Sequence, residues 1–212
     1  MVKTEYIIMA VVLVLVIAVA GAIAFDKDIF AGFNAANAKA TPVPADANTG
    51  AISRPISALT TLSIVDSDVK VKAWKAQKTN VSVIDISSES CIDGLSTTWT
   101  ITYVSDGEQA LVLFDNGAII NIVKTPLPIS ARSQPSLATD GLIDSDKASD
   151  IAAQTMSGLG KTPIGVVSFE LSPGTQNGSV WDVIYRISGG HYLIRLDSSS
   201  GNVIESEQYG MG

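Results

Sequence analysis

The only histidine of the chain, His191, lies close in the sequence to Ser188, Arg195 and Asp197. Serine, histidine and aspartate are the residue types of a nucleophilic triad, in which histidine takes the serine proton and aspartate orients the imidazole. Here they lie on a predicted strand and turn, and adjacent strand residues point to opposite faces of a sheet. The segment therefore predicts a sheet with polar groups on its solvated side, and we expect the chain not to be an enzyme.

Two other segments resemble ligand sites but depart from the required spacing. The segment Asp144–Asp150 holds three aspartates, yet Ser149 stands where a calcium loop needs glycine. The run GLGKT at 158–162 ends like a phosphate-binding loop, but Thr155 replaces the first glycine and the run follows a predicted helix. One histidine and one cysteine are too few ligands for zinc. The sequence thus predicts helix capping at the aspartates, and no metal or cofactor.

Three residues are candidates for covalent modification. Cys91 is the only cysteine, so it can form a disulfide only with another molecule; the alternative is a half-buried thiol. Asn80 and Asn177 each begin an N-x-[ST] triplet, the acceptor sequence for glycosylation outside the cell.

The segment Tyr6–Phe25 is apolar and carries no charge over 20 residues. At about 1.5 Å per residue such a helix matches the hydrocarbon thickness of a bilayer. Residues 1–25 therefore predict a transmembrane anchor, and Lys3 favours an inside N-terminus with the rest of the chain outside the cytoplasm. The alternative is a cleaved signal peptide, because Ala22–Ala24 has the small-x-small cleavage pattern.

Residues 26–56 are rich in alanine and proline and lack periodicity, which predicts a linker. The net charge of the chain is −7, and no basic cluster appears along it. A surface of this sign repels phosphate backbones, so we expect no nucleic-acid partner.

The chain also repeats itself. WTITYVSDGEQALVLFD at 99–115 aligns without a gap to WDVIYRISGGHYLIRLD at 181–197. Tryptophan, tyrosine, glycine, leucine and aspartate recur at matching places, and IVDSD at 64–68 resembles LIDSD at 142–146. Self-similarity at a fixed offset predicts a duplicated structural unit.

Each copy predicts one helix followed by four strands. The helices are expected at Val69–Lys78 and Lys147–Leu159, where aspartates precede apolar residues at helical spacing. Alternating apolar residues and turn glycines predict strands at 81–88, 97–105, 109–115, 118–124, 164–171, 179–188, 191–197 and 202–207.

The predicted fold class is α+β. It consists of two tandem small domains, each with one helix packed on a four-stranded antiparallel meander, preceded by a transmembrane helix. Their predicted limits are 57–124 and 142–212, joined by a proline-containing connector at 125–141.

The second copy resembles the PepSY domain family. The residues that carry the resemblance are Trp181, Val183, Tyr192, Ile194, Asp197, Gly201 and Val203, with Ala148, Ala152 and the Gly158–Gly160 turn upstream. The first copy departs from the pattern, since its predicted helix is lysine-rich and its closing turn is shorter. The resemblance implies an extracytoplasmic, non-catalytic module; relatives occur in metallopeptidase propeptides and membrane-attached proteins, with inhibitory or partner-binding roles.

We therefore expect a membrane-anchored module that binds an extracytoplasmic protein or peptide, with self-association and peptidase regulation as further expectations. The alternative is a structural subunit of a surface filament or layer. Glu5 before a long apolar helix is similar to type IV pilins, but no glycine-terminated leader precedes it, and Lys3 would fit poorly in a filament core.

Overall fold

The computed structural model describes residues 54–127, 135–137, 139–174 and 178–210. All of them belong to one compact unit, Gly50–Gly212. The predicted anchor at Tyr6–Phe25, the linker up to residue 53 and the candidate glycosylation site Asn177 lie outside the described residues. Within the described ranges, no helix combines the length and apolar character needed to cross a bilayer.

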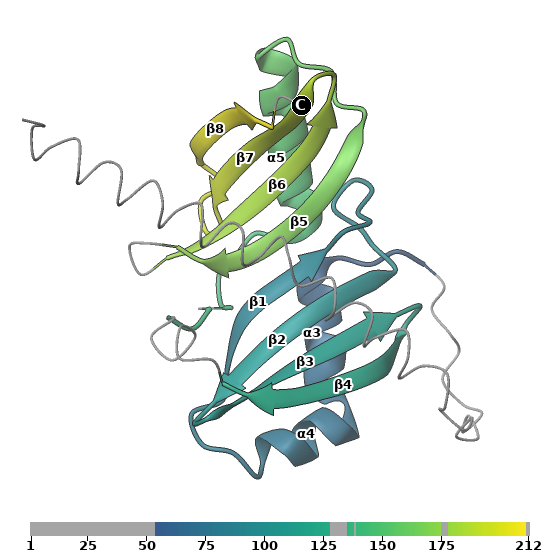
Figure 1. The fold of residues 1–212 in the computed structure, drawn as a ribbon, viewed down its shortest axis with the longest axis vertical. Coiled ribbons are helices and arrows are strands. Elements are labelled where there is room, and N and C mark those ends of the chain that lie inside the picture. Colours follow the sequence, from purple (N-terminus) through teal and green to yellow (C-terminus); the bar gives the residue numbers. More distant parts are fainter. Residues whose placement is uncertain (1–53, 128–134, 138, 175–177, 211–212) are drawn as a thin grey trace, which may run out of the picture. The chain divides into compact units, whose positions relative to one another are not determined.

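Eight antiparallel strands are the main regular elements of the described residues (Figure 1). Each of the eight predicted strands is confirmed, with ends that differ by no more than two residues. The strands are β1 Ser82–Ser88, β2 Thr98–Ser105, β3 Glu108–Asp115, β4 Ala118–Pro126, β5 Gly165–Pro173, β6 Ser179–Ile187, β7 Gly190–Asp197 and β8 Val203–Tyr209.

The prediction of two tandem four-stranded domains is wrong. All eight strands belong to a single sheet in the order β4-β3-β2-β1-β5-β6-β7-β8. Strands β1 and β5 join the two halves through the pairs Ile86–Leu171, Ser87–Glu170 and Ser88–Phe169. In a separate four-stranded meander, β1 or β5 would be an edge strand with unpaired backbone donors and acceptors. Pairing of β1 with β5 satisfies these groups. One cluster of buried apolar side chains continues across both halves.

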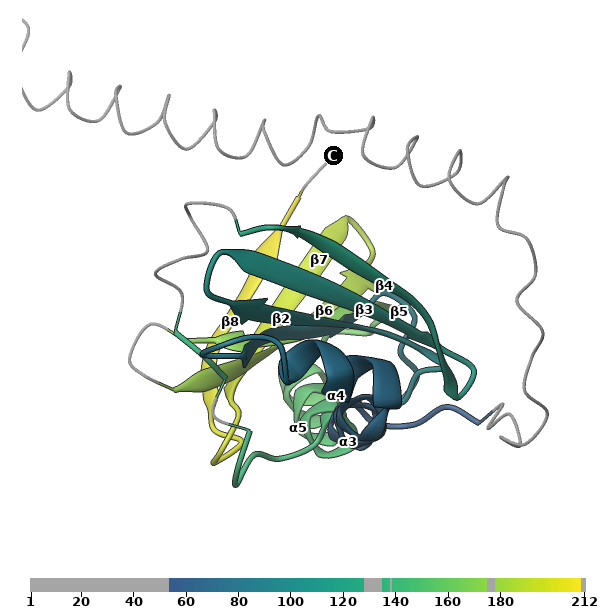
Figure 2. The same ribbon diagram turned by 90° about the horizontal axis from the view of Figure 1, so that it is seen from below.

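Three helices of the described residues cover one face of this sheet (Figure 2). They are α3 Ala58–Ser67, α4 Val69–Lys75 and α5 Ser145–Gly158. The predictions of α4 and α5 are confirmed, whereas α3 was not predicted, so the first half has two helices instead of one. One layer is the eight-stranded sheet and the other is the three helices, so the described structure is mostly β.

The aspartate caps are confirmed at both predicted helices. Asp68 accepts hydrogen bonds from the backbone N–H groups of Lys70 and Val71 at the start of α4. Asp144 Oδ1 accepts from the N–H of Ser145 at 2.7 Å and also from the N–H of Leu59 in α3 at 3.0 Å. One carboxylate thus satisfies unpaired donors at the N-termini of two helices, where negative charge is favourable.

Buried tryptophans fix how the helices of the two halves correspond. The indole N–H of Trp99 donates to the carbonyl of Ile56, and that of Trp181 donates to the carbonyl of Ile143, both at 3.0 Å. Each of these carbonyls lies just before the N-cap of α3 or α5. Helix α5 therefore corresponds to α3, and the predicted match between residues 64–68 and 142–146 is wrong.

The central strands of the two halves are also irregular at similar places. The register of β1 shifts between Val83 and Asp85 against β2, and that of β5 shifts between Val166 and Ser168 against β6. The largest fully buried side chains of the core are aromatic, and the rings of Phe169 and Trp181 meet edge to face with their centroids 5.2 Å apart.

Candidate functional site

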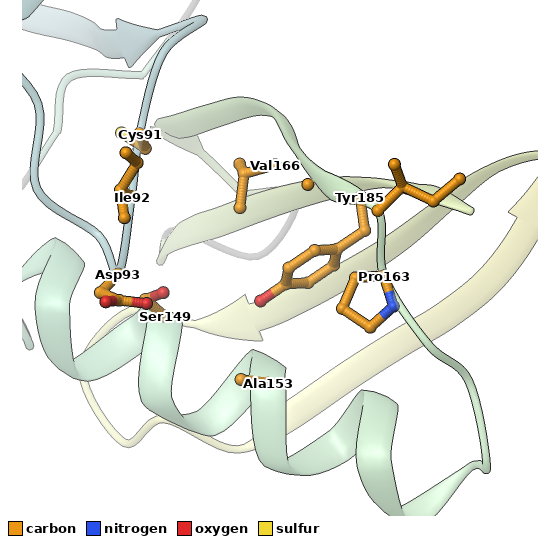
Figure 3. Close-up of a pocket in the computed structure, with 10 residues that line it drawn as sticks. Cys91, Ile92, Asp93, Ser149, Ala153, Pro163, Val166 and Tyr185 are labelled. Atoms are coloured by element: carbon orange, nitrogen blue, oxygen red, sulfur yellow. The ribbon is translucent and has the colours of Figure 1, made fainter.

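A pocket of about 270 Å³ lies beside helix α5 (Figure 3). Its walls come from α5, from β6, from the segment that enters β5 and from the connection between β1 and β2. This connection belongs to the first half of the sheet, whereas the other three walls belong to the second. The pocket therefore exists because β1 and β5 bring the two halves together.

Tyr185 of β6 provides a buried polar group in this pocket. Its side chain points inward, toward the end at which Ser149 and Asp93 lie (Figure 3). Tyr185 is 4% exposed, and its hydroxyl has no hydrogen-bond partner among the described residues. A buried polar group left unpaired costs about 1–3 kcal/mol. An unpaired hydroxyl in a cavity is therefore expected to bind something that the chain does not supply.

The surroundings of the Tyr185 hydroxyl change its acidity. Burial raises its pKa to about 12; the nearby Ser149 hydroxyl opposes this change and the Asp93 carboxylate adds to it. Ser149 is near enough to lower the pKa of Tyr185, but the two hydroxyls do not meet the distance and angle of a normal hydrogen bond. At neutral pH the tyrosine is protonated and can donate or accept a hydrogen bond.

The first half satisfies the corresponding tyrosine internally. Tyr103 lies in β2 at the position that Tyr185 takes in β6, and its hydroxyl donates to Asp66 of α3 at 2.5 Å. Lys75 of α4 pairs with the same Asp66 oxygen at 2.6 Å and lies 4.4 Å from the centre of the Tyr103 ring. Tyr103 thus has a carboxylate and an ammonium as neighbours, both supplied by the chain.

Smaller residues on α5 open the pocket in the second half. Counted from the N-caps, α5 has Ser149 and Ala153 where α3 has Leu62 and Asp66. No helix equivalent to α4 follows α5, since the described chain passes from Gly158 through turns and irregular backbone into β5. Loss of the aspartate leaves the Tyr185 hydroxyl unpaired, and loss of the bulk leaves space beside it.

The wall from the first half is fixed against α5. Gly94 has φ +73°, and a Cβ added there would lie 2.1 Å from the carbonyl oxygen of Ser145. Ser145 Oγ also donates to the Gly94 carbonyl at 2.6 Å. The preceding Asp93 has φ 51°, a left-handed conformation that aspartate tolerates better than most residues. This tight contact holds Asp93 at the pocket.

Cys91 also lines the pocket and is buried, with 5% of its surface exposed. Desolvation raises the pKa of its thiol to about 11, so little thiolate exists at neutral pH. The intermolecular disulfide at Cys91 stays a prediction, and this pocket wall would have to open for the bond to form.

The residues considered for catalysis lie apart or have other partners. His191 and Asp197 lie at opposite ends of β7. The His191 ring stacks on Tyr209 at 5.7 Å, and Arg195 donates to Asp182 and Glu205. Asp197 caps a turn, because it accepts hydrogen bonds from two backbone N–H groups, those of Ser199 and Ser200. These bonds and those of the serine hydroxyls lower its pKa to about 2.

The candidate glycosylation site Asn80 has a local structural role. Asn80 is exposed with φ 53°, and its amide donates to Asp106 at 3.1 and 3.2 Å. Its glycosylation stays a prediction. Across the described ranges, no three histidine, cysteine, aspartate or glutamate side chains gather as a metal site would need.

Sequence reasoning did not identify the pocket residues Asp93, Ser149, Ala153 and Tyr185. The informative pattern was the recurrence of Tyr103 as Tyr185 between copies whose helices differ in the residues facing it. Recognising that pattern required the correct helix correspondence, which the Asp-Ser-Asp motifs obscured.

Comparison with known proteins gives a structural likeness. No protein-family model matches the sequence, and no curated protein is similar to it. The crystal structure of a protein described as "a putative lipoprotein" from Clostridium difficile 630 matches with a TM-score of 0.55 and 16% sequence identity. The match covers 73% of this chain and 93% of that one. At this identity the two proteins share a fold.

Proposed function

We propose that this protein is a membrane-attached, extracytoplasmic, non-catalytic module that binds a protein or peptide partner through the pocket beside α5. The apolar segment Tyr6–Phe25 supports membrane attachment. The description of the similar Clostridium difficile structure as a lipoprotein agrees with a place outside the cytoplasm. Membership of the PepSY family, and with it a role in peptidase regulation, belongs to the same proposal and rests on the sequence resemblance.

The observation that carries the proposal is the combination of an unpaired buried hydroxyl with an apolar rim. Ile92 and Ile164 line the pocket and are 75% and 69% exposed. Large apolar side chains around a cavity with a few polar groups are typical of binding sites. Covering these isoleucines would stabilise a complex, while Tyr185 would select the chemistry of the group that enters.

Assembly into a filament or layer is the second candidate, and the edges of the sheet favour it. Strands β4 and β8 are the two outer strands, and their backbone groups can pair with another chain. Each exposes an isoleucine, Ile120 at 61% in β4 and Ile204 at 57% in β8. In this case the contacts would be between copies of this chain.

Site-specific photo-crosslinking in the native membrane separates the two candidates. A photoreactive amino acid is placed at residue 92 or 164 for the pocket, and at 120 or 204 for the sheet edges. We expect the protein in the membrane fraction and a crosslinked partner at 92 and 164. Crosslinks only between copies of the chain through 120 and 204 would favour assembly, and absence of adducts at 92 and 164 would contradict the binding proposal.

A further inference from the structure

We propose that the pocket beside α5 binds a lysine side chain of the partner polypeptide. This inference rests on the proposed function and names the chemical group that enters the site. The primary ammonium would lie at the end formed by Asp93, Ser149 and Tyr185, and the alkyl chain would lie against the apolar walls (Figure 3).

The first half shows how this fold satisfies such a tyrosine. Helix α4 places Lys75 against Tyr103, and the neighbouring Trp74 contacts the same ring at a centroid distance of 6.1 Å. A cation over a tyrosine face and beside a carboxylate is stabilised by both. The second half keeps the tyrosine and lacks the helix that would bring the lysine. A partner polypeptide could supply in this place what α4 supplies in the other.

After α5, where a helix like α4 would follow, the first lysine of the chain is Lys161, and it has other partners. Lys161 lies three residues after the end of α5, but its ammonium donates to Gln208 at 3.2 Å and lies 5.7 Å from the centre of the Tyr192 ring. No lysine or arginine of the described residues forms an ion pair with Asp93. Within the described ranges, the carboxylate at the pocket thus remains open to an external cation.

The donors of an ammonium match the acceptors of the pocket. A lysine ammonium has three N–H donors and no acceptor. Asp93, Ser149 and Tyr185 offer a carboxylate and two hydroxyl oxygens, one acceptor group for each donor. The five N–H donors of an arginine would exceed this set, and a carboxylate ligand would be repelled by Asp93.

The volume of the pocket suits one side chain. At about 270 Å³ it is larger than a cavity of about 150 Å³ that holds benzene, and smaller than the roughly 300–1,000 Å³ of pockets for drug-sized molecules or cofactors. Ala153, Ile164 and Val166 provide apolar contact for the four methylene groups of a lysine stem. The net charge of −7 also attracts a cationic partner.

The test uses the full chain in detergent micelles, with tyrosine side chains labelled for NMR. Nα-acetyl-lysine-methylamide is the probe, and the norleucine analogue, which lacks the ammonium, is its control. We expect a saturable shift of the Tyr185 resonance with a Kd of about 1–10 mM, as befits one side chain, and at least tenfold weaker binding of the norleucine compound.

Variants locate the bound probe. Asp93→Asn should weaken binding about fivefold or more, and Asp140→Asn, at an exposed turn, should leave it unchanged. Ser149→Leu installs the residue found at the corresponding position of α3 and should abolish binding by filling the pocket. Tyr185→Phe removes the NMR probe of the hydroxyl, so its effect is followed on the backbone amide of Asp93.

Three results would overturn the inference. Equal binding of the lysine and norleucine compounds would show that the ammonium is not recognised. Tighter binding of n-butylamine than of the lysine compound would indicate a free amine as the ligand. A Tyr185 resonance that moves when Lys27 or Lys39 of the linker is replaced by alanine, without any probe, would assign the site to this chain. None of these results decides the crosslinking test, so partner binding can still be tested separately.

Discussion

At the scale of single residues, Tyr185 and Tyr103 should respond oppositely to loss of the hydroxyl. Tyr185→Phe removes an unpaired buried group, and we expect the free energy of unfolding to rise by about 1 kcal/mol. Tyr103→Phe removes the hydrogen bond to Asp66, and we expect a fall of about 1–2 kcal/mol. Urea denaturation of both variants measures the difference, and equal destabilisation would show that Tyr185 has a partner.

Asp85 predicts a pH-dependent stability. It lies in β1, where burial and then the nearby charge of Glu170 raise its pKa to about 7. The folded state therefore holds this proton more tightly than the unfolded state. The contribution of this proton to the free energy of unfolding is fully present below the ordinary pKa of 3.8. It is lost as the pH rises through the folded-state pKa of about 7. The loss is on the order of a few kcal/mol, since one pKa unit corresponds to about 1.4 kcal/mol.

Replacement of Asp85 by asparagine tests this effect. Asp85→Asn should flatten the decline in unfolding free energy between pH 4 and 8 and make the protein more stable than wild type at pH 8. The exposed Asp140→Asn serves as the control and should keep the wild-type profile. A decline of unchanged steepness in Asp85→Asn would assign the pH dependence to other groups.

At the scale of elements, Asp144 should matter more than an ordinary helix cap. Its carboxylate accepts from α5 and α3 at once, whereas Asp68 caps α4 alone. Loss of one cap costs about 1 kcal/mol, so we expect Asp144→Ala to lower the unfolding free energy by roughly twice as much as Asp68→Ala. Thermal or urea unfolding provides the measurement. Equal losses in the two variants would mean that the contact with α3 contributes nothing.

The sequence predicted strands better than helices, and the reason is local. Alternation and turn glycines define each strand within a few residues, so all eight were found. Helix α3 was missed because its ten residues, ALTTLSIVDS, have a weakly defined apolar face and follow an unpatterned linker. Without α3, the sequence repeat matches α5 to α4. The difference between Asp66 of α3 and Ala153 of α5, which creates the pocket, could therefore not be recognised.

At the scale of the whole molecule, alternation shows which residues face a core but not which edge strands pair. The sequence therefore predicted two domains, and only the structure shows that β1 and β5 make them one sheet. The pocket could not be predicted for the same reason, because Asp93 and Tyr185 come from different halves.

Because the two halves share one sheet, we expect a destabilising substitution in one half to lower the stability of the other. Leu171 lies in β5 and is fully buried, so Leu171→Ala should cost about 2–5 kcal/mol. In a variant that keeps Trp99 as its only tryptophan, we expect the unfolding transition reported by Trp99 fluorescence to move to lower urea concentration, with a matching fall in the unfolding free energy. The exposed Ile204→Ala is the control. An unchanged Trp99 transition would show that the halves unfold separately.

The central claim is that the space beside Tyr185 receives part of a partner. The most direct measurement is the yield of the residue 164 photo-crosslink in native membranes, compared between the wild-type background and Ser149→Leu. The account predicts that the filled pocket loses the partner adduct while the protein level and membrane attachment stay the same. An adduct of undiminished yield in Ser149→Leu would contradict it.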